Sequence, residues 1–135
     1  MSYPVAEIEG IGEAIAAKLA AAGVKTTADL LDQCGAAAGR KAMAGTTGID
    51  ERKLLDFVNM ADLMRITGVA GEFSELLEAG GVDTVKELQH RNAENLAAKL
   101  AEVNERKKLT RRTPSASEVG RWIEQAKSLP PMVSH

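Results

Sequence analysis

The sequence predicts an all-α fold built from two repeated units of about four short helices each, packed as one compact domain. The first reason is a repeat, because "GVKTTADLL" at residues 23–31 returns in altered form as "GVDTVKEL" at residues 81–88. The second reason is that apolar residues recur at helical spacing, while no segment alternates apolar and polar residues as a strand does. Either half of a 135-residue chain would bury little surface alone, so we expect the halves to pack together.

The repeat extends well beyond these two stretches. Residues 8–30 align with residues 66–88 at a constant offset of 58 without a gap. Residues 50–64 match residues 115–129 in pattern at an offset of 65, so the second unit carries seven extra residues. Self-similarity of this kind indicates a chain built from copies of one unit. We therefore predict a first unit at 1–65, a second unit at 66–129 and a C-terminal tail at 130–135.

Each unit is predicted to open with a glycine-containing turn and a helix. In the first unit the turn occupies residues 10–12, and an apolar stripe at helical spacing follows it. The stripe is formed by Ile11, Ile15 and Leu19. Gly23, and Gly81 in the second unit, then end this helix, because glycine takes the left-handed conformation of a helix end without a Cβ clash.

The starts of later helices are predicted from their capping residues. A Ser or Thr followed three residues later by an acidic residue can form a capping box, in which each side chain bonds the backbone N–H of the other residue. The pattern occurs at Thr26 and Asp29, at Thr84 and Glu87, and at Ser115 and Glu118. Asp50 begins the fourth helix of the first unit, and Pro130 and Pro131 end that of the second.

The third helix is expected to differ between the units. In the second unit "AENLAAKLAEV" has apolar residues on one helical face, whereas "GAAAGRKAMAG" takes its place in the first. We therefore expect the third helix of the first unit to be short or irregular. The fourth helices carry matching apolar stripes, in which Phe57 corresponds to Trp122. Both rings are predicted to be largely buried.

Composition argues against several classes of function. The net charge of −2 gives the whole molecule no attraction to nucleic acid. Cys34 is the only cysteine and is predicted to be a structural thiol. His90 and His135 are far apart, and the acidic residues are expected on polar helix faces, where nothing shifts their pKa. We expect no metal, no cofactor, no small-molecule substrate and no enzymatic activity.

The sequence has no feature of a membrane or exported protein. No apolar run approaches the roughly 20 residues that a membrane span needs. The start, "MSYPVAEIEG", has no basic region followed by an apolar core. We expect a cytoplasmic protein that does not contact a membrane.

The first turn and helix carry a family resemblance. "IEGIGEAIAAKL" resembles the helix-hairpin-helix motif, which is matched at Ile8, Gly10, Ile11, Gly12, Ala16 and Leu19. The tandem arrangement is similar to the paired helix-hairpin-helix domains of DNA-repair proteins and to the N-terminal domains of RecA-like recombinases of the Rad51 type. It most resembles an uncharacterised bacterial family of such tandem domains, with no assigned function. The resemblance covers residues 6–129 and is more specific for fold than for activity.

What the resemblance implies is binding to the DNA backbone. In such modules the hairpin directs main-chain N–H groups near a helix N-terminus at a phosphate, and glycines allow the close approach. On this sequence the amides would belong to Gly10, Ile11 and Gly12 in the first unit and to Gly68, Val69 and Gly71 in the second. The alternative is that these glycines only let two helices turn sharply and pack.

The hairpins depart from the pattern of the family. In the second unit Ala70 replaces the second motif glycine and Ser74 replaces the alanine. Glu9 and Glu13 flank the first hairpin and Glu72 follows the second, where DNA-binding examples tend to have Lys or Arg. A carboxylate a few ångströms from a phosphate repels it by about 1 kcal/mol even in water.

Positive charge is concentrated in the extra residues of the second unit. The stretch "NERKKLTRRTP" contains Arg106, Lys107, Lys108, Arg111 and Arg112. A phosphate backbone would be bound most readily here, although a solvated loop beside a helix C-terminus has the same composition.

Two functions remain open. One is a non-catalytic, sequence-nonspecific module that binds duplex DNA through the hairpin amides and the basic stretch. The other is a protein-interaction adaptor of the same fold that does not bind nucleic acid. The frequency of the fold among DNA-binding proteins favours the first function, and the acidic residues at the hairpins favour the second.

Overall fold

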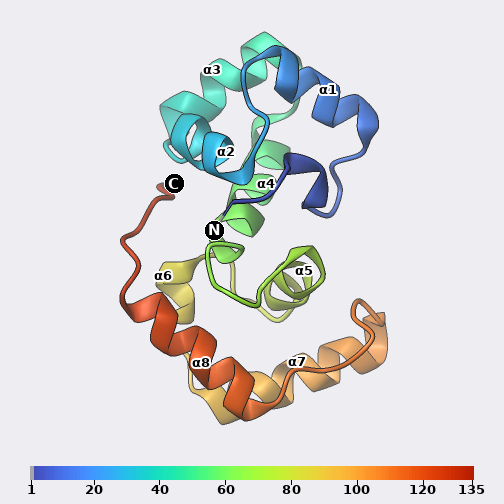
Figure 1. The fold of residues 1–135 in the computed structure, drawn as a ribbon, viewed down its shortest axis with the longest axis vertical. Helices are drawn as coiled ribbons and strands as arrows, with labels where there is room; N and C mark the ends of the chain where they lie inside the picture. The colour runs from blue at the N-terminus through green and yellow to red at the C-terminus, as the bar shows by residue number, and fades with distance from the viewer. Residues whose placement is uncertain (1) are drawn as a thin grey trace.

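The computed structural model describes residues 2–135, and these residues form an all-α fold (Figure 1). A short 3-10 helix, η1 (Val5–Glu7), comes first. The α-helices are α1 (Glu13–Ala21), α2 (Thr27–Cys34), α3 (Ala37–Thr47), α4 (Glu51–Leu63), α5 (Gly71–Ala79), α6 (Val85–Leu88), α7 (Ala93–Lys107) and α8 (Ala116–Lys127). The described residues contain no strand, only an isolated antiparallel bridge between Pro4 and Thr26. The predicted all-α class is confirmed.

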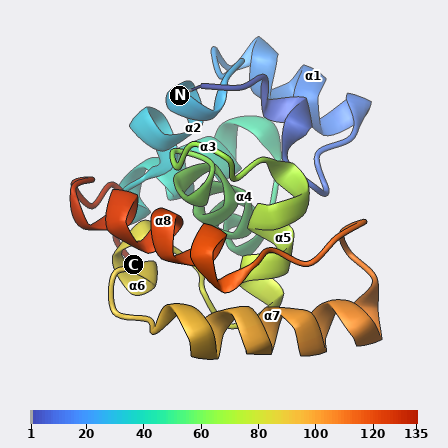
Figure 2. The same cartoon turned by 60° about the horizontal axis from the view of Figure 1, so that its bottom comes forward.

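The helices form two groups with α4 between them. Figure 1 shows α1 to α3 at one end of the molecule and α6 to α8 at the other, and Figure 2 shows α7 and α8 side by side. Apolar residues between Val5 and Met64 form one core, and apolar residues between Leu63 and Ala126 form a second. α4 supplies side chains to both cores, so it connects the two halves.

The rings at equivalent positions of the fourth helices are buried, as predicted. Phe57 in α4 is 3% exposed and Trp122 in α8 is 2% exposed. Phe57 belongs to the first core and Trp122 to the second. That the two halves superpose over their whole length stays a prediction, as do the predicted unit boundaries.

The predicted glycine caps are confirmed. Gly23 follows the last turn of α1 with φ +89°, and Gly81 follows α5 with φ +93°. In both cases the next residue, Val24 or Val82, donates its N–H back into the last turn of the helix. This left-handed conformation strains any residue with a Cβ, which is why glycine occupies both positions.

The predicted capping boxes are complete at one of three positions. Thr26 Oγ1 accepts from Asp29 N at 3.1 Å, and Asp29 Oδ2 accepts from Thr26 N at 3.1 Å. Among the described hydrogen bonds only the first half forms at Thr84 and at Ser115, where the hydroxyl accepts from the backbone N–H three residues on. The reciprocal bond predicted at Thr84 is not formed among the described hydrogen bonds. At Ser115 the backbone N–H acts on the carboxylate of Glu118 and helps to lower its pKa, while the same carboxylate also accepts from Arg112.

The prediction of a short or irregular third helix in the first unit was also wrong. α3 is a regular helix of eleven residues, despite its glycines. Arg40 is 5% exposed and donates to the carbonyls of Cys34 at 3.0 Å and Gly35 at 2.8 Å. Gly39 packs so closely that a Cβ there would lie 2.0 Å from Gln33 O. Tertiary packing therefore overrides the low helix propensity of glycine.

Hydrogen bonds also tie the halves together, besides the continuous chain. The carboxylate of Asp62, in α4, accepts from Val85 N at 2.8 Å and from Arg65 Nη1 at 2.8 Å. The C-terminal tail returns from α8 to the first half, where Ser134 N donates to Gly35 O at 2.9 Å (Figure 1). Arg40 also donates to Ser134 O, so one buried guanidinium binds both α2 and the tail.

Candidate nucleic-acid interface

Both predicted hairpins form the same closed turn. Ile11 N donates to Ile8 O at 3.1 Å, and Val69 N donates to Ile66 O at 3.0 Å. The third residue of each turn is a glycine with positive φ, +94° at Gly10 and +95° at Gly68. A type II turn requires this conformation at its third position, so the two glycines make the turns possible.

The turns correct two of the predicted amide contacts. The N–H groups of Ile11 and Val69 are used in closing the turns, so they are not available to a phosphate. Their side chains are buried, Ile11 at 5% exposure in the first core and Val69 at 0% in the second. These two residues hold the hairpins to the cores.

The backbone N–H groups that have no described acceptor follow Ile11, at the start of α1. The N-cap residues are Gly12 for α1 and Ala70 for α5, and neither makes a side-chain capping bond. Gly12, Glu13 and Ala14 have no N–H acceptor among the described hydrogen bonds. Gly12 is exposed, and a Cβ built on it would meet nothing within 4 Å. The start of α1 is therefore accessible to an anion.

Gly71, the third predicted residue of the second hairpin, is a packing residue. It is the first residue of α5 and is buried. A Cβ there would lie 2.3 Å from the carbonyl oxygen of Glu7. The missing side chain therefore lets η1 approach α5 and does not open space for a phosphate.

Carboxylates surround the second hairpin. Glu7, Glu9 and Glu72 line a shallow hollow of about 360 Å³ together with Gly68, Ala70, Gly71 and Phe73. Burial raises the pKa of Glu75, on the next turn of α5, and the charge of Glu9 raises it further while Lys107 opposes the rise. Glu9 and Lys107 therefore both lie close enough to act on Glu75, so the first hairpin and the end of α7 both lie near α5.

Among the described residues, two cations of the basic stretch are paired with carboxylates and three form no hydrogen bond or ion pair. Arg112 donates two hydrogen bonds of 2.8 Å to the carboxylate of Glu118. Arg106 lies 3.9 Å from Glu102, with both side chains more than half exposed, which is a weak pair. Lys107, Lys108 and Arg111 are exposed and make no hydrogen bond or ion pair among the described residues.

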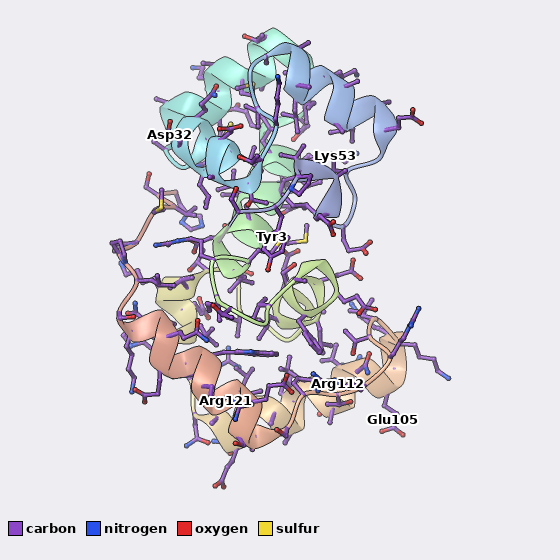
Figure 3. The ribbon with its side chains drawn as sticks, in the orientation of Figure 1. Tyr3, Asp32, Lys53, Glu105, Arg112 and Arg121 are labelled. Carbon is purple, nitrogen blue, oxygen red and sulfur yellow. The ribbon has the colours of Figure 1, made fainter. Side chains whose placement is uncertain are left out.

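Phe73 and Asn104 shape this stretch, and neither was predicted from the sequence to do so. The ring of Phe73, on α5, lies beneath Arg112, whose guanidinium is 5.2 Å from the ring centroid. The side-chain amide of Asn104 binds both backbone groups of Thr110 in this connection. Its Oδ1 accepts from Thr110 N at 2.9 Å, and its Nδ2 donates to Thr110 O at 3.2 Å. Figure 3 shows Arg112 on the connection that follows α7, with Glu105 near the helix end.

The basic stretch and both hairpins lie around α5. Figure 1 shows the loop before α1 and the connection between α7 and α8 at the right, with α5 between them. Glu7 and Glu9 line one hollow with the second hairpin, and the Arg112–Phe73 contact links the connection to the first turn of α5. The fold therefore places acidic hairpins next to a basic connection.

The expectation that acidic residues lie only on polar helix faces was wrong for two of them. Asp62 is 1% exposed, and it is satisfied by the two hydrogen bonds already described. Glu78 is half-buried, and burial, together with the charges of Asp56, Asp83 and Glu75, raises its pKa to about 7. The sequence spacing did not reveal this because α5 packs between α4 and α7.

The cysteine and the possible metal-ligating side chains form no site among the described residues. Cys34 is fully buried in the first core, and burial raises the pKa of its thiol, as predicted for a structural cysteine. No group of three His, Cys, Asp or Glu side chains comes together to hold a metal ion in the part of the chain that the structure describes.

None of the helices within residues 2–135 is both long and apolar enough to span a bilayer.

These features define a small all-helical protein with two apolar cores and two glycine turns, each followed by a helix without a side-chain cap. The chain belongs to the family described as a domain of unknown function (DUF4332), whose model matches residues 9–129. No curated protein and no solved structure matches the chain.

Proposed function

We propose that this protein is a non-catalytic, sequence-nonspecific module that binds the phosphate backbone of duplex DNA, with hairpins of the helix-hairpin-helix type. The observation that carries the proposal is a set of three exposed cations, Lys107, Lys108 and Arg111, that form no hydrogen bond or ion pair among the described residues. Of the three, Lys107 also acts through its charge on Glu75. The Arg112–Phe73 contact holds their connection beside the second hairpin.

The cations supply most of the binding free energy in this proposal. Neutralising a phosphate releases condensed counterions, and the logarithm of affinity falls with the logarithm of salt by about 0.9 per phosphate contact. Three cations therefore give a slope of roughly −3 and a modest affinity. The net charge of −2 adds no long-range attraction.

The start of α1 supplies a second, weaker contact. The free amides of Gly12, Glu13 and Ala14 and the positive end of the helix dipole favour an anion there. The side chains of Glu9 and Glu13 oppose it, because each carboxylate repels a nearby phosphate by about 1 kcal/mol in water. Replacing Glu9 and Glu13 by Lys is therefore expected to strengthen binding.

Recognition in this proposal does not depend on base sequence. Exposed lysines and arginines on a connection between helices contact phosphates and carry no base information. The aromatic ring nearest to them, Phe73, is covered by Arg112 and packs against Trp122 at 5.3 Å between centroids. It is therefore not free to stack on unpaired bases, and duplex is the expected form of DNA.

A salt-dependent titration tests the proposal. Fluorescence anisotropy of a labelled duplex is measured at several salt concentrations with the wild type and with the triple variant K107E/K108E/R111E. The variant leaves Arg112 intact, because that residue is part of the packing. The matched control is K41E/K86E/K99E, which makes the same change of charge at exposed lysines elsewhere.

We expect the wild type and the control to bind at low salt with a slope near −3, and the triple variant to lose binding while its circular dichroism is unchanged. If the wild type does not bind duplex DNA at low salt, or if the control loses binding as completely as the triple variant, the proposal is wrong.

A protein-interaction adaptor is the second candidate, and one observation favours it. Glu7, Glu9 and Glu72 line the hollow at the second hairpin, which suits a Lys or Arg side chain of a partner better than a phosphate. In nuclease-treated extract, a partner retained by the wild type and lost with E9K/E72K would support this function. Retention that persists in the variant would oppose it.

A further inference from the structure

The contact between α4 and α5 contains a carboxylate without a hydrogen-bond donor. Glu78 is in the last turns of α5, and its Oε2 is shielded from solvent and has no partner among the described residues. Three carboxylates act on it from three places: Asp56 on α4, Asp83 on the connection after α5, and Glu75 one turn earlier on α5. An ionised carboxylate in this position is poorly solvated and is repelled by all three neighbours.

Among the described residues, no cation acts on Glu78 itself. The charged groups that act on Glu78 are all acidic, and Lys107, which reaches α5 from α7, acts on Glu75 instead. Burial is the largest cause that raises the pKa of Glu78, followed by the charge of Asp56, and the pKa becomes about 7. Near neutral pH the carboxyl group is therefore protonated in a large fraction of molecules.

A second buried acceptor without a donor lies on the facing helix. Asn59 is three residues after Asp56 on α4, is 5% exposed, and has an Oδ1 with no partner among the described residues. α4 and α5 pack against each other. Buried acceptors without donors are rare in folded proteins and are destabilising. A protonated Glu78 carries its own O–H donor and no longer has the charge that Asp56 on α4 repels.

We propose that the α4–α5 contact is a proton-dependent joint, closed when Glu78 is neutral and loosened when Glu78 is ionised. The joint lies where the two halves meet, because α4 supplies Leu63 to the second core and Gly71 of α5 packs against Glu7 O. Protonation therefore sets how firmly the second half is held against the first. The joint does not depend on DNA binding.

The direction of the pH dependence follows from the raised pKa. The unfolded chain has the ordinary Glu value of 4.5, and the folded value is about 7. The folded state therefore holds the proton more tightly, and the stabilisation is fully present below pH 4.5. It declines as pH rises from 4.5 to about 7 and is absent above that pH. The joint is looser at pH 8 than at pH 6.

Two measurements test the joint. The first is a ¹³C NMR titration of the side-chain carboxyl carbons of the wild type, with Glu78 assigned from the signal missing in E78Q. The second is amide hydrogen exchange of residues 51–79 at pH 6 and pH 8, corrected for the intrinsic pH dependence of exchange, in the wild type, in E78Q and in E105Q. The E78Q variant keeps a neutral side chain with a donor at every pH, and Glu105 is an exposed acid without a described partner.

We expect the Glu78 signal to titrate near pH 7, and exchange in α5 to rise on the order of tenfold from pH 6 to pH 8 in the wild type and E105Q, since one pKa unit is a factor of ten. E78Q is expected to show no such rise. The proposal is overturned if Glu78 titrates near 4.5, or if α5 exchange in the wild type does not change with pH. An equal rise in E78Q also overturns it. The NMR titration needs only folded wild-type protein, so the proposal stays testable even if E78Q is unstable.

Discussion

The guanidinium of Arg112 lies 5.2 Å from the ring centroid of Phe73, on a helix that precedes it by more than thirty residues. The same guanidinium makes two hydrogen bonds of 2.8 Å to Glu118 at the start of α8. Phe73 in turn packs against Trp122. One cation of the basic stretch therefore positions the whole connection between α7 and α8 relative to α5.

Arg112→Ala is expected to release this connection. Hydrogen exchange of residues 108–115 should rise and the melting temperature should fall, whereas Arg111→Ala should change neither, because Arg111 has no described partner. The bonds to Arg112 hold the pKa of Glu118 below its ordinary value of 4.5. The stabilisation is therefore present above pH 4.5 and is lost as pH falls below it. A destabilisation by Arg112→Ala that is as large at pH 3 as at pH 7 would contradict this role.

Trp122→Ala is expected to unfold the second half. Removing a buried aromatic ring costs about 3–5 kcal/mol, a large share of the stability of a small domain. Urea unfolding followed by circular dichroism measures the loss, and Trp122→Phe, which keeps most of the apolar volume, should lose less. Native Trp122 fluorescence should be blue-shifted relative to free indole. An emission maximum equal to that of free indole in native buffer would show that the ring is not buried.

Gly71→Ala and Gly12→Ala form a matched pair at the starts of α5 and α1. The new Cβ at position 71 would lie 2.3 Å from Glu7 O, a backbone atom that cannot move alone, whereas at position 12 it would meet nothing within 4 Å. We expect Gly71→Ala to destabilise by about 1–3 kcal/mol through overpacking and Gly12→Ala to change stability by less than about 1 kcal/mol. Chemical denaturation of both variants measures the difference, and equal stabilities would rule out the packing role of Gly71.

Asp62→Ala is expected to cost about 3 kcal/mol, because it leaves Val85 N without its acceptor and Arg65 without its partner in a buried environment. Asp50→Ala is the control, because it removes an exposed N-cap whose loss costs about 1 kcal/mol. Differential scanning calorimetry measures both variants. The role assigned to Asp62 would be wrong if the two variants melted at the same temperature.

The parts of the fold that the sequence predicted depend on residues close to one another in the chain. The left-handed glycines at 23 and 81, the hydroxyl caps at Thr26 and Thr84 and the closed turns at 8–11 and 66–69 each involve residues within about five positions. α3 was predicted wrongly because its glycines are compensated by contacts to α2 and to the tail. Such compensation cannot be detected from local propensity.

The sequence located the glycine turns and the basic stretch of the candidate site but not the contacts of their residues. The two glycine turns and the basic stretch were located correctly as features of the chain. The sequence could not show that the amides of Ile11 and Val69 are already bonded, that Gly71 faces Glu7, or that Arg112 is paired while Lys107 forms no described hydrogen bond or ion pair. Each of these depends on which groups meet in space.

Local sequence is enough to predict that this chain is helical, where most of its helices begin and end, and that Phe57 and Trp122 are buried. These features follow from backbone hydrogen bonds, glycine conformation and apolar spacing, all of which act over a few residues. The packing of the helices sets which cations are paired, which carboxylates are buried and which acidic groups act on Glu78. Desolvation and charge interactions depend on distance in space, and that distance is set by how the helices pack.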